Sequence, residues 1–206
     1  MIEAAMLLGK SSNSLSMWEY IDSTELLTTS SAIAVLQIPA GAQVGDLLVA
    51  VISPGNESIK TEMISGGWQR LTSGDQDYVC VTRLTSFTER PSYRKAAANA
   101  VYATLAAFRS SGWSSVSLVA HNSPYKSESV ETVSNNNLIL SIATTPGFAG
   151  SWTARMNGGS QVPRRLRVNS PAMAIYSANI SQQSLVTNIS VDARDGSERN
   201  IILTVS

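Results

Sequence analysis

The chain has 206 residues, of which 43% are hydrophobic and 15% charged, so it is long enough and apolar enough to bury a substantial core. Fifteen basic residues balance fifteen acidic ones, and this neutrality argues against a sequence-specific nucleic-acid-binding protein or one that adheres to anionic membranes. The single cysteine, Cys80, excludes a disulfide within the chain, and no apolar run approaches the ~18 residues that a membrane-spanning helix needs.

The N-terminal segment combines an apolar cluster, residues 4–8, with a serine-rich stretch that leads to Trp18. Glu3 precedes the cluster and Lys10 follows it, which reverses the charge order of a secretory signal, so the protein is expected to be made in a cytoplasm without an export signal of its own. Because this stretch cannot build a core, we predict an arm at 1–22 and a single domain at 23–206. The expected assembly contacts of the arm, packed against another subunit, are Met6, Leu7, Leu8 and Trp18.

Strand patterns bounded by turn-forming residues follow one another along the rest of the chain. The run 47–52 is apolar throughout and lies between Gly45-Asp46 and Pro54-Gly55, so it is too short for a core helix and is predicted to be a strand covered on both faces. The other expected strands are 32–38, 66–71, 77–84, 115–121, 138–144, 151–156, 165–168, 173–180, 186–191 and 200–205.

The segment 91–112 is ambiguous. It is rich in alanine and lies between Ser92, which can cap a helix, and Gly112, which can end one. Val101, Tyr102 and Thr104 favour a strand instead.

A weak internal symmetry decides how this segment is interpreted, because the order of strand patterns occurs twice along the chain. The paired segments are 45–54 with 136–146, 77–86 with 172–181, and 100–108 with 199–206. We therefore predict a strand at 100–108, preceded by either a short helix or a loop at 92–98. The expected fold class is all-β, a jelly-roll-like antiparallel β-sandwich of roughly 8–12 strands.

The chain offers few residues for catalysis or metal binding. His121 is the only histidine, and Cys80 lies between two valines of an expected strand, where a buried, unreactive thiol is the usual case. One histidine and one cysteine do not make a typical zinc site, and Asp195-Gly196 fits a hairpin turn better than a calcium loop. We expect no catalytic residue, no metal and no cofactor, and hence no enzyme.

One charge cluster stands out, because Arg164, Arg165 and Arg167 occur together without a nearby acid. The first interpretation is a solvated strand edge, where like charges discourage pairing with other chains. The second is a contact with an anion or with a carboxylate of a neighbouring subunit.

Four tryptophans are spread along the chain, and the serines around Trp113 suggest that it is the most exposed of them, whereas Trp68 is expected in the core. Aromatic rings on a β-sandwich face can stack on sugars. The alternative hypothesis of a glycan-binding surface therefore names Trp113, Tyr125 and Trp152.

The segments "IPAGAQVGDLLVAVIS", "GGWQRL", "DYVCVTRL" and "AVYATLAAFR" resemble β-sandwich modules found in structural proteins of tailed bacteriophages. Gly45-Asp46, Gly67-Trp68, Tyr78 and the stretch 103–109 fill the positions typical of those modules, whereas Ser110 and Gly66 depart from the usual glycine and alanine. The resemblance covers about 32–206 and is looser after residue 145.

This resemblance implies a non-catalytic virion protein, either a head decoration or a minor component of the tail or baseplate, and it carries over no functional residue. Such a protein would be made in the host cytoplasm, form a homo-oligomer and bind other virion proteins. The alternative is a carbohydrate-binding adhesin module that recognises a host-surface glycan.

Overall fold

The computed structural model describes residues 17–28, 33–54, 61–63, 65–72, 78–88, 90–95, 101–122, 128–132, 136–145, 152–156, 159–160, 163–167, 169, 171–180, 185–192 and 199–206. These residues contain seventeen strands and no helix. The strands are β1 (Glu19–Thr28), β2 (Ile33–Val35), β3 (Leu47–Pro54), β4 (Thr61–Met63), β5 (Gln69–Arg70), β6 (Tyr78–Arg83), β7 (Ser92–Lys95), β8 (Val101–Arg109), β9 (Val116–Asn122), β10 (Glu128–Glu131), β11 (Asn137–Thr145), β12 (Thr153–Met156), β13 (Gly159–Ser160), β14 (Arg165–Arg167), β15 (Ala172–Ile180), β16 (Leu185–Asp192) and β17 (Arg199–Val205).

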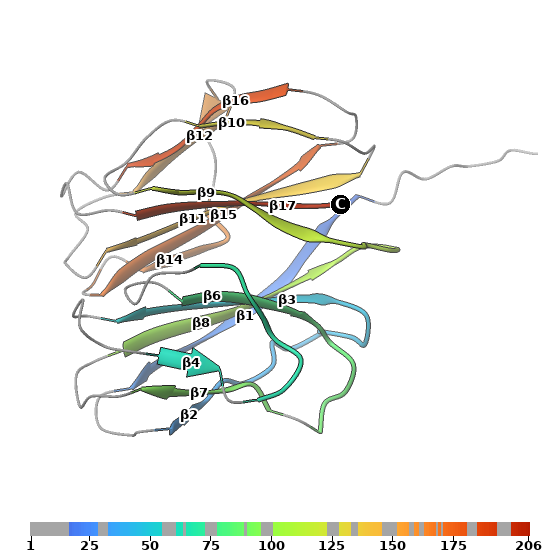
Figure 1. Cartoon of the computed structure of the whole chain (residues 1–206), viewed down its shortest axis with the longest axis vertical. Helices are drawn as coiled ribbons and strands as arrows, with labels where there is room; N and C mark the ends of the chain where they lie inside the picture. The colour runs from blue at the N-terminus through green and yellow to red at the C-terminus, as the bar shows by residue number, and fades with distance from the viewer. Residues whose placement is uncertain are drawn as a thin grey trace, which may run out of the picture.

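The strands form four antiparallel sheets, which are stacked as layers in Figure 1. The two inner layers are five-stranded sheets, with the orders β1-β8-β3-β6-β5 and β14-β15-β11-β17-β9. The outer layers are smaller, with the orders β2-β7-β4 and β10-β16-β12-β13. The expected all-β antiparallel sandwich is therefore confirmed, but the chain builds two such sandwiches, which explains why it has more strands than the roughly 8–12 expected of one.

The two sandwiches repeat one topology. We call β1–β8 repeat 1 and β9–β17 repeat 2. Reading the second inner sheet from its other edge gives β9-β17-β11-β15-β14, which matches β1-β8-β3-β6-β5 strand for strand in chain order, and the outer sheets correspond in the same way apart from the added β13. The duplicated order that the sequence suggested is present at the level of strands.

The duplication extends to the pairing register. Leu47 in β3 is paired with Phe108 on one side and Arg83 on the other. Leu138 in β11 is paired in the same way with Val205 and with Asn179. Residues 47 and 138 therefore occupy equivalent positions, and so do the residues that precede them.

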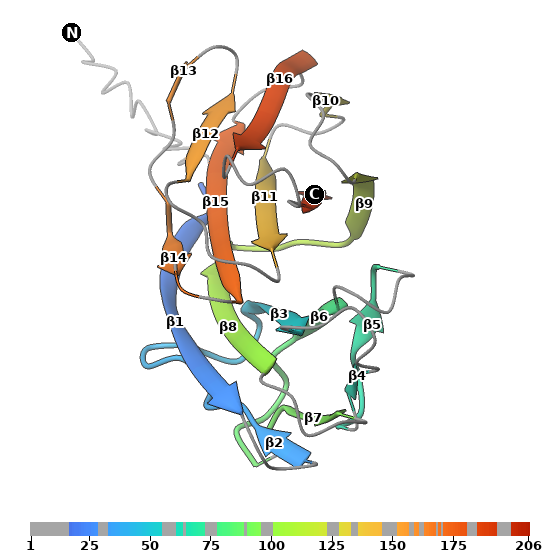
Figure 2. The same cartoon turned by 90° about the vertical axis from the view of Figure 1, so that its left-hand side faces the viewer.

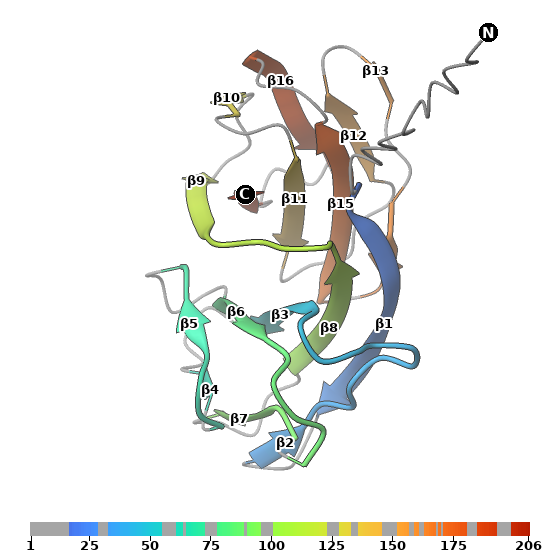
Figure 3. The same cartoon turned by 90° about the vertical axis from the view of Figure 1, so that its right-hand side faces the viewer.

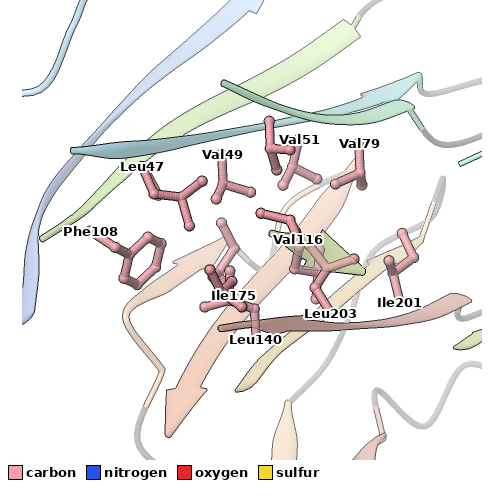
Figure 4. Close-up of a cluster of buried hydrophobic side chains, with 14 of the residues drawn as sticks. Leu47, Val49, Val51, Val79, Phe108, Val116, Leu140, Ile175, Ile201 and Leu203 are labelled. Carbon is pink, nitrogen blue, oxygen red and sulfur yellow. The ribbon is translucent and has the colours of Figure 1, made fainter. Parts of the chain in front are cut away.

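The inner sheets meet along a large apolar interface, which we call the seam. Figure 4 shows side chains from the two sheets pointing toward one another across it. Nine buried residues come from each repeat: Trp18, Leu47, Val49, Val51, Val79, Val81, Tyr102, Ala106 and Phe108 from repeat 1, and Val116, Leu138, Leu140, Ile142, Met173, Ile175, Ile201, Leu203 and Val205 from repeat 2.

Strand β3 is covered on both faces, as its unbroken apolar run predicted. Successive side chains of a strand point to opposite faces, so one set from β3 enters the seam while Leu48, Ala50 and Ile52 pack toward the smaller sheet of repeat 1. In repeat 2 the smaller sheet covers the inner sheet through two further clusters, which include Trp152 and Met156.

Two expectations differ from the structure. Residues 92–95 form strand β7, neither the helix nor the loop expected there, and Tyr93 is fully buried between the two sheets of repeat 1. The rest of that segment, residues 96–98, lies outside the described residues. The boundary between arm and domain at 22/23 is also wrong, because it falls within β1, which pairs with β8 from Glu19 onward.

Candidate functional site

The two repeats each place a tryptophan on the other at one end of the seam. Trp18 immediately precedes β1, and its Nε1 donates a hydrogen bond to the carbonyl oxygen of Asn136 in repeat 2, 3.4 Å away. Trp113 precedes β9, and its Nε1 donates to the carbonyl oxygen of Gly45 in repeat 1, at 3.1 Å. Gly45 and Asn136 stand at equivalent positions, two residues before Leu47 and Leu138, so the two contacts are reciprocal.

Each tryptophan also receives a bond in return. The Asn179 side-chain amide donates to the Trp18 carbonyl oxygen at 2.7 Å, and the Arg83 guanidinium donates to the Trp113 carbonyl oxygen. Asn179 and Arg83 are again equivalent, because they pair with Leu138 and Leu47. Arg83 also lies 4.2 Å from the centre of the Trp113 ring, a distance typical of a cation–π contact.

These contacts correct two predictions. Trp18 is only 4% exposed and belongs to the core of its own chain, so it is not available to pack against another subunit. Trp113 is partly buried against the seam and not an exposed ring. The other predicted assembly contacts, Met6, Leu7 and Leu8, lie outside the described residues.

The arginine cluster lies where β14 of repeat 2 comes next to β1 of repeat 1, as Figure 2 shows. Arg165 forms an ion pair with Glu25, whose carboxylate also accepts a hydrogen bond from the Tyr102 hydroxyl. Arg167 lies 4.5 Å from the centre of the Tyr102 ring. We call these four residues the arginine clasp, because they join the two repeats.

The third arginine also contacts its own chain. Arg164 Nε donates to the Ser177 hydroxyl at 2.8 Å, and its guanidinium lies 5.9 Å from the centre of the Tyr20 ring. Neither sequence interpretation, the solvated edge or the external anion contact, anticipated that the cluster would link two halves of one molecule.

The clasp perturbs the ionisation of its members. The hydrogen bond from Arg165, followed by that from Tyr102, holds the pKa of Glu25 below its ordinary value, while Glu25 raises the pKa of Arg165. Burial raises the pKa of Tyr102. Because the carboxylate and the guanidinium each stabilise the other's charge, the clasp is an ion-paired contact between the two repeats.

The residues that carry the phage resemblance have structural roles. Asp46 is 3% exposed, and its carboxylate accepts two hydrogen bonds from Arg109, both at 2.9 Å, and one from the Gln43 backbone at 2.7 Å. Gly45 has φ 101° and Gly67 has φ 78°, conformations that side-chain-bearing residues rarely adopt. The motif thus fixes the loops around β3, β6 and β8.

Three exposed apolar side chains belong to the segments that precede β1, precede β3 and follow β6; these ends of the three strands lie on the right-hand side in Figure 1. Val44 and Phe87 are 63% and 53% exposed, and their loops are joined by the hydrogen bond from the Gly45 backbone N–H to the Leu84 carbonyl at 2.8 Å. Met17, which is 64% exposed, adjoins Trp18 at the same end. We call these three residues the apolar loop end.

A small hollow opens beside Trp68, which is partly buried. Its volume is about 40 Å³, room for roughly one or two waters and far less than the few hundred Å³ of typical ligand pockets. Its lining comprises Ile38, Leu48, Ser65, Gly66, Trp68, Thr82, Arg83, Leu84, Thr85, Ser86 and Pro91.

The two described residues of the glycan hypothesis, Trp113 and Trp152, do not share a groove. Trp152 is 9% exposed in a core cluster of repeat 2, where its Nε1 donates to the Arg167 carbonyl oxygen at 3.2 Å. Trp113 packs against the seam, which is a different core. Tyr125 lies outside the described residues.

Comparison with family models, with curated proteins and with solved structures found no match. Within the part of the chain that the structure describes, no helix is long and apolar enough to cross a membrane. The same residues contain no group of three or more histidine, cysteine, aspartate or glutamate side chains placed to hold a metal ion.

Proposed function

We propose that this protein is a non-catalytic structural or accessory component of a tailed-bacteriophage virion, made in the host cytoplasm. It acts through contacts with other virion proteins, as a homo-oligomer, either on the head or as a minor part of the tail or baseplate. The resemblance of Gly45-Asp46, Gly67-Trp68 and 103–109 to phage β-sandwich modules supports this assignment.

The observation that carries the proposal is the apolar loop end. Val44 and Phe87 are large hydrophobic residues on adjacent loops, and exposed apolar groups gathered in this way mark contact surfaces between proteins. Val44 belongs to the loop that the motif residues Gly45 and Asp46 hold in place, so the same motif that builds the fold also presents this side chain.

Mass spectrometry of purified virions tests the assignment directly, and absence of the protein from the particles would refute it. A double substitution, V44D with F87D, tests the surface. Because each introduces a charge at a contact that excludes water, incorporation should fall roughly tenfold or more, which corresponds to about 1.4 kcal/mol. Ile33→Asp is the matched control, since Ile33 is similarly exposed, at 48%, on β2 of an outer sheet.

A further inference from the structure

The seam has the construction of a symmetric dimer interface, although it lies within one chain. In a twofold interface, a residue of one partner contacts a residue of the other, and the same contact recurs with the partners exchanged. Trp18 with Asn136 and Trp113 with Gly45 are a similar pair of contacts: the two acceptors are equivalent, and the two tryptophans are offset by one position in the register.

The composition of the seam agrees with this interpretation. Each repeat contributes nine buried residues, nearly all aliphatic or aromatic. Obligate dimer interfaces resemble a domain core cut in half in just this way. The face that repeat 1 presents is therefore complementary to repeat 2 irrespective of which chain supplies repeat 2.

The covalent connection between the repeats is bonded to them near both of its ends and is exposed at its centre; the Asn136 side-chain amide donates to the Ser110 hydroxyl at 3.1 Å. The chain crosses from the end of β8 to β9 through residues 110–115, which Figure 3 shows as one short segment. Ser111 and Gly112 are exposed, and a side chain built at Gly112 would meet no atom within 4 Å. Trp113 and the serines that follow it are bonded to the two repeats.

From these observations we propose that the seam can form between two molecules as well as within one, and that the partner molecule is a second copy of the same chain. The two copies exchange repeats, so that repeat 1 of each copy binds repeat 2 of the other and the seam forms twice. Exchange of identical elements needs no new contact, because both seams are those of the monomer. The proposal rests on the fold and holds or fails independently of the virion assignment.

Two variants of the full chain that differ only in the connection test the proposal. The first lacks residues 110–112, which shortens the reach between the repeats by up to about 10 Å. The second gains a protease recognition sequence between Ser111 and Gly112. After refolding, light scattering with size exclusion should give the shortened variant at least twice the particle mass of the lengthened one, with both masses compared in units of the 21.9 kDa chain. Since the two variants share every outer surface, a dimer formed through an outer surface would occur in both.

Cleavage of the lengthened variant supplies the second measurement. The two fragments should remain a 1:1 complex after the connection is cut, and an isotopically labelled copy should exchange fragments with it after partial unfolding. A folded shortened variant with the same particle mass as the lengthened one, or fragments that separate under native conditions, would each overturn the proposal. Should the shortened variant fail to fold, the cleaved complex and its exchange with the labelled copy decide alone.

Discussion

Replacement of Asp46 by alanine should destabilise the protein by about 2–4 kcal/mol. The substitution removes three hydrogen bonds to a buried carboxylate, two from Arg109 and one from the Gln43 backbone. Hydrogen bonds to charged groups contribute about 1.5–3 kcal/mol each. The sum overstates the loss, because the Arg109 side chain is 31% exposed and regains water when its partner is removed.

Urea unfolding followed by tryptophan fluorescence measures this loss. With a slope of about 2 kcal/mol per molar urea, the midpoint should fall by about 1–2 M. Glu62→Ala is the control, because the Glu62–Arg94 pair is 3.4 Å long with side chains about 60% exposed, and its loss should cost less than about 0.5 kcal/mol. If the free energy of unfolding of Asp46→Ala is within about 1 kcal/mol of the wild-type value, the hydrogen bonds of Asp46 do not stabilise the fold as the structure indicates.

Three further predictions concern the core and the clasp. Trp18→Ala removes an almost fully buried indole from the seam and should lower the free energy of unfolding by about 3–5 kcal/mol in the same urea assay. A loss below about 1 kcal/mol would contradict the position of Trp18 in the core. Cys80 is fully buried and burial raises its thiol pKa, so an aromatic disulfide reagent at about pH 8 should label it only after denaturation; rapid labelling of the native protein would contradict this. Because the folded-state pKa of Glu25 is lowered, its contribution is present above the unfolded pKa of about 4.3 and is lost as the pH falls through the folded value. In thermal melts at neutral pH, Glu25→Gln should therefore lower the free energy of unfolding by up to about 1 kcal/mol, a small value because the Glu25 side chain is 45% exposed. This difference from the wild type should disappear near pH 2. An equal difference at both pH values would exclude an ionic origin.

The central strands could be predicted from the sequence because their environment is uniform. An unbroken apolar run such as that of β3 is stable only between two covering layers, and the same pattern at β11 revealed the duplication. That duplication, and not local propensity, correctly made β8 a strand, since an alanine-rich segment with Ser92 and Gly112 at its ends fits a helix equally well.

Strand β1 could not be predicted in the same way. Its sequence, EYIDSTELLT, is rich in polar and acidic residues, and it is a strand because it pairs with β8 along its whole length. The contacts between repeats were equally hidden, because Trp18 and Asn136 are 118 positions apart and the partner of Arg165 is on a different repeat. A signal was available for Asp46 and Arg109, since a lone acid and a lone base at the ends of two apolar strands suggest an ion pair.

The edge strands of the inner sheets determine whether neighbouring molecules can pair with them when many copies lie close together. An edge strand offers unpaired backbone groups to any other chain, and proteins protect it with bulges or charges. The pairing of β1 with β8 has a register shift between Tyr20 and Asp22. The pairing of β9 with β17 has a similar shift between Ile202 and Leu203 of β17. On β14 the exposed Leu166 is flanked by two arginines. These features protect three of the four edges of the inner sheets, so many copies held close together would not pair with one another through β1, β9 or β14.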